Sequence, residues 1–338
     1  MRVAESLNRA LHEALAADPS VLVLGEDVLD PYGGAFKITK GLSSRFPGRV
    51  LATPISEGGI VGVAGGLALA GGKAIVEIMF SDFVTLAFDQ IVNFAGKSVS
   101  MYGRRVRMPL IVRCPSGGGR GYGPTHSQSL QKHFIGVPGL SVFEVSPFDD
   151  HRTLFGELLD LGEPCVLFED KVLYTRRIFS GGVVDELFRY DVVVTPGDGA
   201  VDRVARVYLD DPMRADCVII TPGGLAHRAL AAMRTLLLEH EISCLLLVPR
   251  RLYPFNAAPL SPLLEQAGAV VVAEESTAGG TWGAEVAQQV HARLWGRLRR
   301  PVTLVHSADS VIPAATHLER DVLVRDTAMI RAVQELLR

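Results

Sequence analysis

Cysteine is scarce and positive charge is not in excess in this chain of 338 residues. The four cysteines, Cys114, Cys165, Cys217 and Cys244, lie far apart, which excludes CxxC redox pairs and zinc-knuckle spacing. Each lies in or beside an apolar run, so we expect buried free thiols in a reducing compartment. The net charge of −3 lacks the basic surplus that is typical of nucleic-acid scaffolds, so no nucleic-acid partner is expected.

Uncharged stretches long enough to cross a membrane are also lacking. The best candidate, Gly58–Gly72, is rich in glycine and ends at Lys73, whereas a bilayer needs about 20 apolar residues. The N-terminus carries Arg2 and Glu5 at once and does not resemble a signal peptide. We therefore expect a cytoplasmic protein without a membrane partner.

Several common catalytic motifs are missing. No GxGxxG occurs, which excludes the usual dinucleotide fingerprint, and neither HExxH nor GxSxG occurs. Gly96-Lys97-Ser98 ends like a phosphate-binding P-loop, but Ile91 stands where that motif requires glycine. The chemistry must therefore lie in another constellation.

What the sequence does contain is an alternation of short apolar runs with helical stretches. Apolar residues four positions apart predict an opening amphipathic helix at Val3, Leu7, Leu11 and Leu15. Runs rich in β-branched residues predict buried strands at Val21–Leu24, Ala74–Phe80, Pro109–Val112, Ser141–Val145 and Cys165–Phe168. This order predicts an α/β fold with parallel sheets covered by helices on both faces.

The stretch 177–213 differs, because its glycines, prolines and scattered charges follow no clear period. We predict an extended crossover here, between a first domain at 1–176 and a second at 214–338. In the second domain the pattern predicts helices at Ala226–His240 and Gly283–Leu298. It predicts strands at Cys217–Thr221, Cys244–Val248, Ala269–Ala273 and Val302–Val305.

The motif TPISE at 53–57 introduces a helix with a stripe of small residues at every fourth position, Gly58, Gly62, Gly66 and Ala70. Helical geometry places the stripe on one face, where another helix can approach closely. Two interpretations stay open, tight packing within the domain or a subunit interface. Glu57 lies where a carboxylate is either a stabilising first-turn residue or a functional group.

Two further segments carry candidate site residues. The motif EIMFSDF at 77–83 ends a predicted strand with aromatic residues. Residues 114–129 then form a long glycine-rich loop that closes on His126. Such a loop lets bare backbone approach a ligand, although a flexible surface loop has the same composition. A lone histidine is often structural, and its place at the end of this loop makes His126 a catalytic candidate.

Together these motifs, with FDQIVN at 88–93, THSQS at 125–129 and the prolines Pro138 and Pro147, resemble the β subunit of thiamine-diphosphate-dependent 2-oxo acid dehydrogenases, the E1 component. That family includes pyruvate, branched-chain 2-oxo acid and acetoin dehydrogenases. The resemblance covers nearly the whole chain, including Pro249–Pro254, Glu275 and Gly283–Glu285. It implies two doubly wound α/β domains, a pyrimidine-binding thiamine-diphosphate domain and a transketolase C-terminal-like domain.

The resemblance also implies roles for individual residues. Glu57 matches the glutamate that hydrogen-bonds the ring nitrogen of the cofactor's aminopyrimidine, where a buried carboxyl can share a proton. Phe83 matches the aromatic residue that packs on the pyrimidine ring, and Met79 stands at the cofactor where many members have glutamine. His126 matches the histidine near the thiazolium and substrate, a candidate proton donor or oxyanion partner.

The diphosphate and Mg²⁺ of thiamine diphosphate are expected on another chain. The family holds them with a GDG motif followed at a set distance by asparagine. This chain has Gly197-Asp198-Gly199, but the next asparagine, Asn256, is far too distant, so we interpret the motif as chance. The resemblance therefore implies an E1 α-like partner that supplies these ligands in an α2β2 assembly, with no metal ligand on this chain. Leu161 replaces the usual aspartate of the family's monovalent-cation loop, which argues against K⁺.

Three functions fit these observations. The first is an E1 β chain that, with its α partner, oxidatively decarboxylates a 2-oxo acid and passes the acyl group to the lipoyl domain of an acyltransferase, E2. The second keeps the cofactor in a split transketolase-like subunit that delivers a two-carbon unit to an acyl carrier protein. The third is a non-catalytic α/β binding subunit, against which the Glu57 carboxyl at a close-packed helix argues.

Overall fold

The computed structural model describes residues 1–195 and 201–338. The chain divides into two compact units that interleave along the sequence. Unit 1 comprises Met1–Gly117, Gly136–Phe143 and Asp150–Ile178, and unit 2 comprises Gly118–Ile135, Glu144–Asp149 and Phe179–Arg338. Within the described ranges, no helix combines the length and the apolar character that a membrane crossing requires.

The sheet of unit 1 is parallel in every strand pair for which a register is given, as the continuous apolar runs predict. Within the unit its strands follow the order β5-β6-β4-β3-β1-β2. Glu77 at the end of β3 pairs in register with Arg113 on β4. The strands are β1 (Val21–Gly25), β2 (Val50–Ala52), β3 (Lys73–Glu77), β4 (Leu110–Ser116), β5 (Ser141–Glu144) and β6 (Cys165–Asp170).

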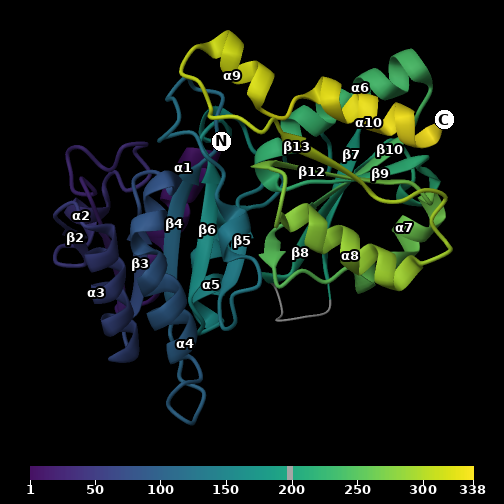
Figure 1. The fold of residues 1–338 in the computed structure, drawn as a ribbon. Coiled ribbons are helices and arrows are strands. Elements are labelled where there is room, and N and C mark those ends of the chain that lie inside the picture. Colours follow the sequence, from purple (N-terminus) through teal and green to yellow (C-terminus); the bar gives the residue numbers. More distant parts are fainter. Residues whose placement is uncertain (196–200) are drawn as a thin grey trace. The chain divides into compact units, whose positions relative to one another are not determined.

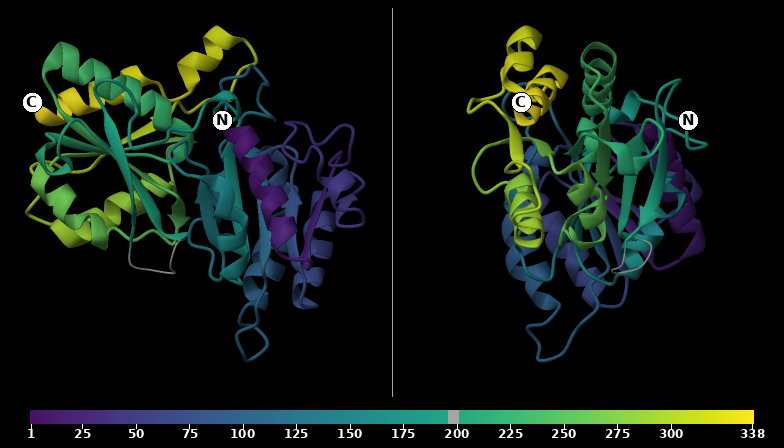
Figure 2. Two further views of the ribbon diagram at one scale, coloured as in Figure 1. Left: turned by 180° about the vertical axis from the view of Figure 1, so that it is seen from behind. Right: turned by 90° about the vertical axis from the view of Figure 1, so that its right-hand side faces the viewer.

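Helices cover both faces of this sheet, as predicted (Figures 1 and 2). Helix α1 (Val3–Ala17) packs with α5 (Leu154–Asp160) on one face. Its apolar residues repeat at helical spacing and therefore lie on one side of the helix, where they are buried: Val3, Leu7, Leu11 and Leu15. The other face carries α3 (Glu57–Leu69), the 3-10 turn η1 (Ser81–Ala87), the π-helical turn η2 (Gln90–Ala95) and α4 (Gly96–Ser98). The short α2 (Leu42–Arg45) lies beside β2.

The small-residue stripe of α3 serves packing within unit 1 along only part of its length. A Cβ at Gly58 would lie 3.1 Å from the Leu86 carbonyl oxygen, and a Cβ at Gly62 would lie 3.2 Å from Gln90 Oε1. Gly66 is exposed and has nothing within 4 Å of its Cβ position. The first half of the stripe is therefore packed against η1 and η2, and the second half lies open.

Unit 2 contains a mixed sheet in the order β13-β12-β9-β10-β8-β7. Strand β9 pairs in parallel with β10 and with β12, and β12 pairs in parallel with β13. Strand β8 pairs antiparallel with β7 and with β10. The strands of this sheet are β7 (Arg189–Val194), β8 (Arg203–Tyr208), β9 (Cys217–Ile220), β10 (Cys244–Pro249), β12 (Val270–Thr277) and β13 (Thr303–Ser307). The short strand β11 (Arg251–Tyr253) of unit 2 is not part of it. The predicted extended crossover at 177–213 is thus wrong where β7 and β8 form a hairpin-like pair. Because β7 lies at the sheet edge and is only partly buried, it lacks a continuous apolar run.

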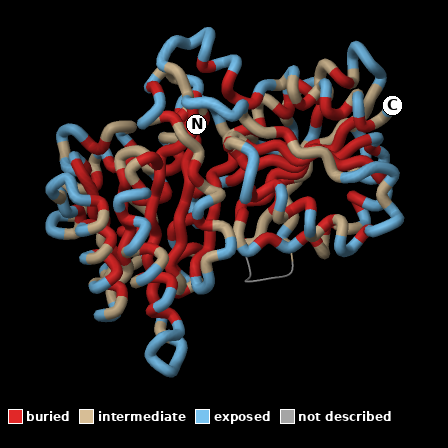
Figure 3. The backbone as a smooth tube through the Cα atoms, in the orientation of Figure 1, coloured by how far each residue is buried: buried red, intermediate tan, exposed pale blue. Residues whose placement is uncertain are grey.

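Helices again flank the sheet of unit 2 on both faces (Figure 1). Helix α6 (Ala226–His240), which has the predicted bounds, packs with α10 (Asp326–Leu337) on one face, and α7 (Ser261–Ala267) packs with α8 (Trp282–Leu294) on the other. Helix α9 (Thr316–Val322) precedes α10. Figure 3 shows the strands as the most buried part. All four cysteines are buried and free, as predicted, and Cys217 and Cys244 pair in register on neighbouring strands.

Candidate active site

Glu57 is the first residue of α3 in unit 1 and is only 5% exposed. The preceding residue, Ser56, is the N-cap but makes no side-chain capping bond, and its carbonyl accepts the Ile60 N–H at 2.8 Å. A carboxylate in the first helical turn is stabilised by the helix dipole. Burial of that carboxylate carries a desolvation cost, which an ordinary first-turn glutamate avoids by remaining in water.

A second buried carboxyl interacts with Glu57 and was missed at the sequence level. Glu26 directly follows β1, is 8% exposed, and its Oε1 is buried without a hydrogen-bond partner. The pKa of Glu26 is raised, first by burial and then by the negative charges of Glu57 and Asp27. Its position after a buried parallel strand was the available signal, because ligands bind at the carboxyl ends of such strands.

The same strand ends carry another unsatisfied polar atom. The Thr53 N–H donates to the Gly25 carbonyl at 3.0 Å, which places Thr53 beside the end of β1, and its Oγ1 is buried without a partner. Unsatisfied buried polar atoms are rare in native proteins. Thr53 Oγ1 and Glu26 Oε1 therefore mark a place in unit 1 where a polar ligand would supply the missing hydrogen bonds.

Phe83 and Met79 lie on the element that packs against α3. Phe83 is on η1 and half-buried, and Met79 lies half-buried between β3 and η1. Because Gly58 lets the first turn of α3 meet the end of η1 closely, unit 1 brings Glu57, Met79 and Phe83 to neighbouring elements. An aromatic face and a carboxyl together suit a flat heterocycle with ring nitrogen atoms.

A buried ionic network lies in the sheet next to these residues. The fully buried Arg113 donates to both oxygens of Glu169, at 2.7 and 2.8 Å, and to Glu77 Oε2 at 2.6 Å. Tyr174 Oη donates to Glu169 Oε2 at 2.8 Å. Burial raises the pKa of Glu77, an effect that the positive charge of Arg113 partly opposes.

This network is connected to η1 through aromatic contacts. The ring of Tyr174 lies 5.1 Å from that of Phe36, which in turn lies 5.6 Å from Phe80, and Phe80 contacts Phe83 edge-on at 6.2 Å. Aromatic pairs at these separations favour defined ring orientations. The network and the aromatic chain thus position Phe83 from inside the sheet.

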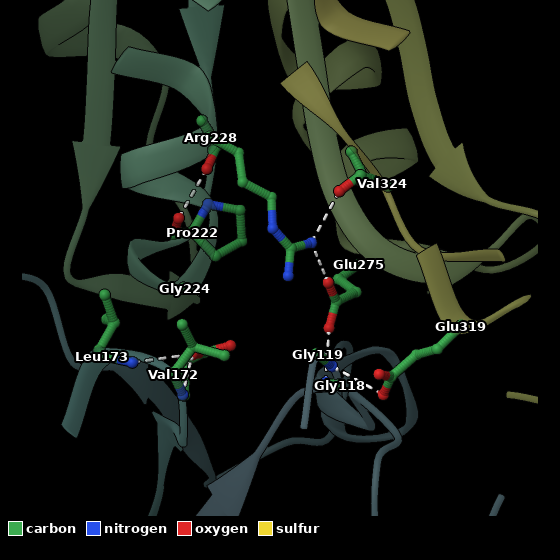
Figure 4. Close-up of polar contacts among 12 residues, drawn as sticks. Gly118, Gly119, Val172, Leu173, Pro222, Gly224, Arg228, Glu275, Glu319 and Val324 are labelled. Carbon is green, nitrogen blue, oxygen red and sulfur yellow. Dashed lines mark hydrogen bonds and ion pairs between the residues drawn. The ribbon is translucent and has the colours of Figure 1, made fainter. Parts of the chain in front are cut away.

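His126 belongs to unit 2, where the glycine-rich loop is held by carboxylates (Figure 4). The N–H groups of Gly119 and Gly121 donate to Glu319 at 2.8 and 3.0 Å, and Gly118 N–H donates to Glu275 Oε1 at 2.9 Å. Arg228 pairs with Glu275 and donates to the Val324 carbonyl at 2.7 Å. The expectation of bare backbone open to a ligand is therefore wrong at these three glycines.

The loop depends on glycine for both space and backbone conformation. A Cβ at Gly118 would lie 2.6 Å from Leu323 Cδ1, and Gly121 has a φ of +70°. His126 follows this anchored stretch and is half-buried, with Nδ1 3.0 Å from Thr125 Oγ1. The loop therefore presents His126 from a fixed backbone.

A cavity of about 570 Å³ with several polar side chains in its lining opens farther along the same segment in unit 2. Its lining includes Gln128, Ser129, His133 and Asp309. Burial and the neighbouring Lys132 lower the pKa of His133, so this imidazole is neutral at pH 7. Two residues of the cavity lining are joined by a hydrogen bond, in which Lys132 Nζ donates to the Thr277 carbonyl at 3.0 Å.

The described residues contain no group of three or more His, Cys, Asp or Glu side chains that could hold a metal ion. Gly197-Asp198-Gly199, interpreted above as a chance motif, lies outside the described residues. The carboxyl, the aromatic face and the unsatisfied atoms of unit 1 thus fit the pyrimidine half of thiamine diphosphate.

Comparison with known proteins assigns a domain family to each of two successive parts of the chain. Residues 1–176 match the pyrimidine-binding domain of transketolase, and residues 206–329 match the transketolase C-terminal domain. A split-gene transketolase, solved as an inactive β4 tetramer, shares the fold with a TM-score of 0.72 over 100% of this chain and 98% of its own, at 22% identity. The fold is therefore that of the transketolase-like proteins.

Relatives of higher sequence identity define a narrower family within the transketolase-like proteins. The chain is 34% identical to the pyruvate dehydrogenase E1 subunit β of Leifsonia xyli, over 92% of this chain and 87% of the relative. It is 32% identical to a mitochondrial pyruvate dehydrogenase E1 subunit β-2 of Oryza sativa, covering 99% and 85%. It is 31% identical to the β subunit of an acetoin:2,6-dichlorophenolindophenol oxidoreductase of Cupriavidus necator, covering 97% and 94%. The chain belongs to the family of E1 β subunits of thiamine-diphosphate-dependent 2-oxo acid dehydrogenases, as its motifs predict.

Proposed function

We propose that this chain is the β subunit of an E1 component that oxidatively decarboxylates a 2-oxo acid and transfers the acyl group to a lipoyl domain. The observation that carries the proposal is the buried Glu57 carboxyl at the start of α3, next to a second buried carboxyl and to the element that bears Phe83. A structural subunit would gain nothing from two neighbouring buried carboxyls, where the charge of Glu57 adds to burial in raising the pKa of Glu26.

Thiamine diphosphate, when bound, supplies a nucleophilic thiazolium carbon and an acceptor for the electron pair released by decarboxylation. In this proposal Glu57 holds a proton at the pyrimidine ring nitrogen, and Phe83 and Met79 orient the ring from η1. Glu26, whose pKa is raised, retains its proton to higher pH than an ordinary glutamate and so reduces the negative charge beside Glu57. His126 donates a proton or a hydrogen bond to the substrate.

The proposed α-like partner fits the exposed surface of α3 and η1. Large apolar side chains are exposed on these elements and just before α3, with Ile55 at 82%, Val63 at 60% and Leu86 at 65%. Contiguous exposed apolar surface of this kind marks protein interfaces. In the proposed α2β2 assembly, the partner covers this surface and supplies the ligands for the diphosphate and Mg²⁺.

The test is co-expression with a candidate α-like chain, followed by calorimetry with thiamine diphosphate and Mg²⁺. We expect tight binding by the α–β complex and no tight binding by this chain alone, because its sequence lacks the asparagine that follows the family's GDG motif. Micromolar binding by the isolated chain would contradict the shared site. Failure of the complex to bind would favour the non-catalytic subunit.

The reaction itself is tested with a panel of 2-oxo acids and 2,6-dichlorophenolindophenol as an artificial electron acceptor, which needs no carrier protein. Turnover with any member of the panel supports decarboxylation by the complex. Replacing the dye by a lipoyl domain or by an acyl carrier protein then distinguishes an E1 component from a split transketolase-like enzyme. Acylation of the acyl carrier protein alone would overturn the E1 assignment.

A further inference from the structure

A basic and aromatic surface lies on unit 2, apart from every group described above. Trp295 follows α8 and is 85% exposed, whereas the chain's other tryptophan, Trp282 at the start of the same helix, is fully buried. An exposed tryptophan leaves a large apolar side chain in contact with water, and tryptophan is enriched among the residues that contribute most to binding at protein interfaces.

A shallow apolar trough of about 560 Å³ adjoins Trp295, between α8 and β13. Its lining is mostly alanine and aliphatic side chains: Ala284, Ala287, Ala292, Val302 and Leu304. His291 holds the two elements together, since its Nε2 accepts the Val302 N–H at 3.0 Å. The trough is therefore a fixed feature that can receive an apolar side chain.

Positive charge is concentrated in the segment of the chain that contains Trp295. From Val286 to Ala308 the sequence contains four arginines and no aspartate, glutamate or lysine, a formal charge of +4 in a chain whose total is −3. All four arginines, Arg293, Arg297, Arg299 and Arg300, are exposed. Arg297 pairs with Glu265 at 3.0 Å, whereas Arg293 and Arg300 make no ion pair given for the described residues.

The surface lies at the edge of the unit 2 sheet opposite the His126 loop. Gly118 of that loop binds Glu275 near the end of β12, whereas the Arg299 N–H donates at 2.8 Å to Gly268, which precedes β12. Ligands of open α/β sheets bind at the carboxyl ends of the strands. A partner at Trp295 would therefore bind without reaching the catalytic edge.

We propose that Trp295, the trough and the exposed arginines of the same segment, together the α8 surface, dock an acidic segment of a partner protein that inserts one apolar side chain. The apolar trough disfavours a nucleic-acid backbone, whose phosphates would be desolvated there without donors. A single aromatic anchor within a charged rim is typical of transient interfaces, where charge raises the association rate. This surface is distinct from the uncharged α3 face and does not depend on the proposed reaction.

The probe is a fluorescein-labelled helical peptide with glutamates on one face and leucines on the other, and its control carries lysines in place of the glutamates. We expect the full-length chain to bind the acidic peptide, with a blue shift of Trp295 emission, and to bind the lysine peptide at least tenfold more weakly. Trp295→Ala should weaken binding about tenfold or more. Because Trp295 is exposed, this variant should melt at the wild-type temperature.

A matched pair of charge reversals localises the site. Arg300→Glu, in the exposed arginine segment after Trp295, should weaken binding of the acidic peptide by about three- to tenfold at low salt. Arg331→Glu, exposed on α10 on the other face of the sheet, should leave this binding unchanged. Equal affinity for both peptides, equal effects of the two reversals, or an unchanged affinity in Trp295→Ala would overturn the proposal. Tighter, Trp295-dependent binding of a single-stranded RNA of equal charge would overturn it in favour of nucleic acid.

Discussion

Replacing Glu57 by glutamine isolates the proton-sharing role of this carboxyl. The substitution keeps the size and a hydrogen-bonding group at a position that is only 5% exposed, but an amide cannot share a proton with a ring nitrogen. We expect the α–β complex to lose at least about 10²-fold in the rate of exchange of the cofactor's C2 proton, or ~2.7 kcal/mol in activation free energy. Cofactor affinity should change little, because the proposed diphosphate ligands lie on the partner.

The same variant has a second consequence that follows from the two-carboxyl geometry. Burial and the charge of Glu57 are the two largest causes that raise the pKa of Glu26. Glu57→Gln removes the charge and leaves the burial, so the pKa of Glu26 should fall while remaining above its ordinary value of about 4.3. Carbon-13 NMR of labelled glutamate side chains in the wild type and the variant measures this shift.

Two results would refute this reasoning. Equal exchange rates in complexes that are fully loaded with cofactor would mean that Glu57 does not hold the ring nitrogen. An unchanged pKa of Glu26 would mean that the two carboxyls do not interact. Glu13→Gln is the matched control, since Glu13 lies on the exposed side of α1 and should affect neither measurement.

Three further predictions follow from the remaining contacts. His126→Ala should lower turnover of the complex by about 10²–10⁴-fold without impairing assembly, measured by steady-state kinetics and gel filtration; wild-type turnover would make His126 structural. Arg113→Met leaves two buried carboxyls, Glu77 and Glu169, without their cation and should lower the free energy of unfolding by about 3–5 kcal/mol. Urea unfolding measures this loss, and an unchanged urea midpoint would contradict it. The pKa of Glu26 is raised in the folded protein, so this residue favours the folded state below its ordinary pKa, and that contribution to the free energy of unfolding is lost as the pH rises through the raised pKa. Glu26→Gln should therefore stabilise the chain at pH 8 and leave its stability unchanged near pH 4. Equal stability of Glu26→Gln and wild type at pH 8 would contradict the Glu26 prediction.

Local pattern determined much of the fold. Helix α6 occupies the predicted Ala226–His240, and β1 begins at the predicted Val21, because apolar periodicity in the sequence reflects which side of an element faces the core. The hairpin-like pair of β7 and β8 could not be predicted in this way. Its edge strand β7 is stabilised by pairing with a neighbour and not by continuous burial, so its sequence carries no distinctive period.

The residues of the candidate site also differ in whether local sequence patterns predict them. Glu57, Met79, Phe83 and His126 could be named from motifs, since each lies within a short segment whose residues are read together. The carboxylates that hold the glycine-rich loop, Glu275 and Glu319, lie about 150 and 200 residues beyond it in the sequence. Only folding brings such groups to the amides they satisfy, because no local period encodes a contact across that separation.

The pairing of the two buried carboxyls shows the same limit most clearly. Glu26 directly follows a strand and Glu57 begins a helix 31 positions later, and neither position is unusual for a glutamate when taken alone. The amino-acid sequence determined that a carboxyl would begin the small-residue helix. The tertiary structure decided that this carboxyl would be desolvated beside a second one, because burial and charge–charge coupling are properties of the space between elements and not of either element.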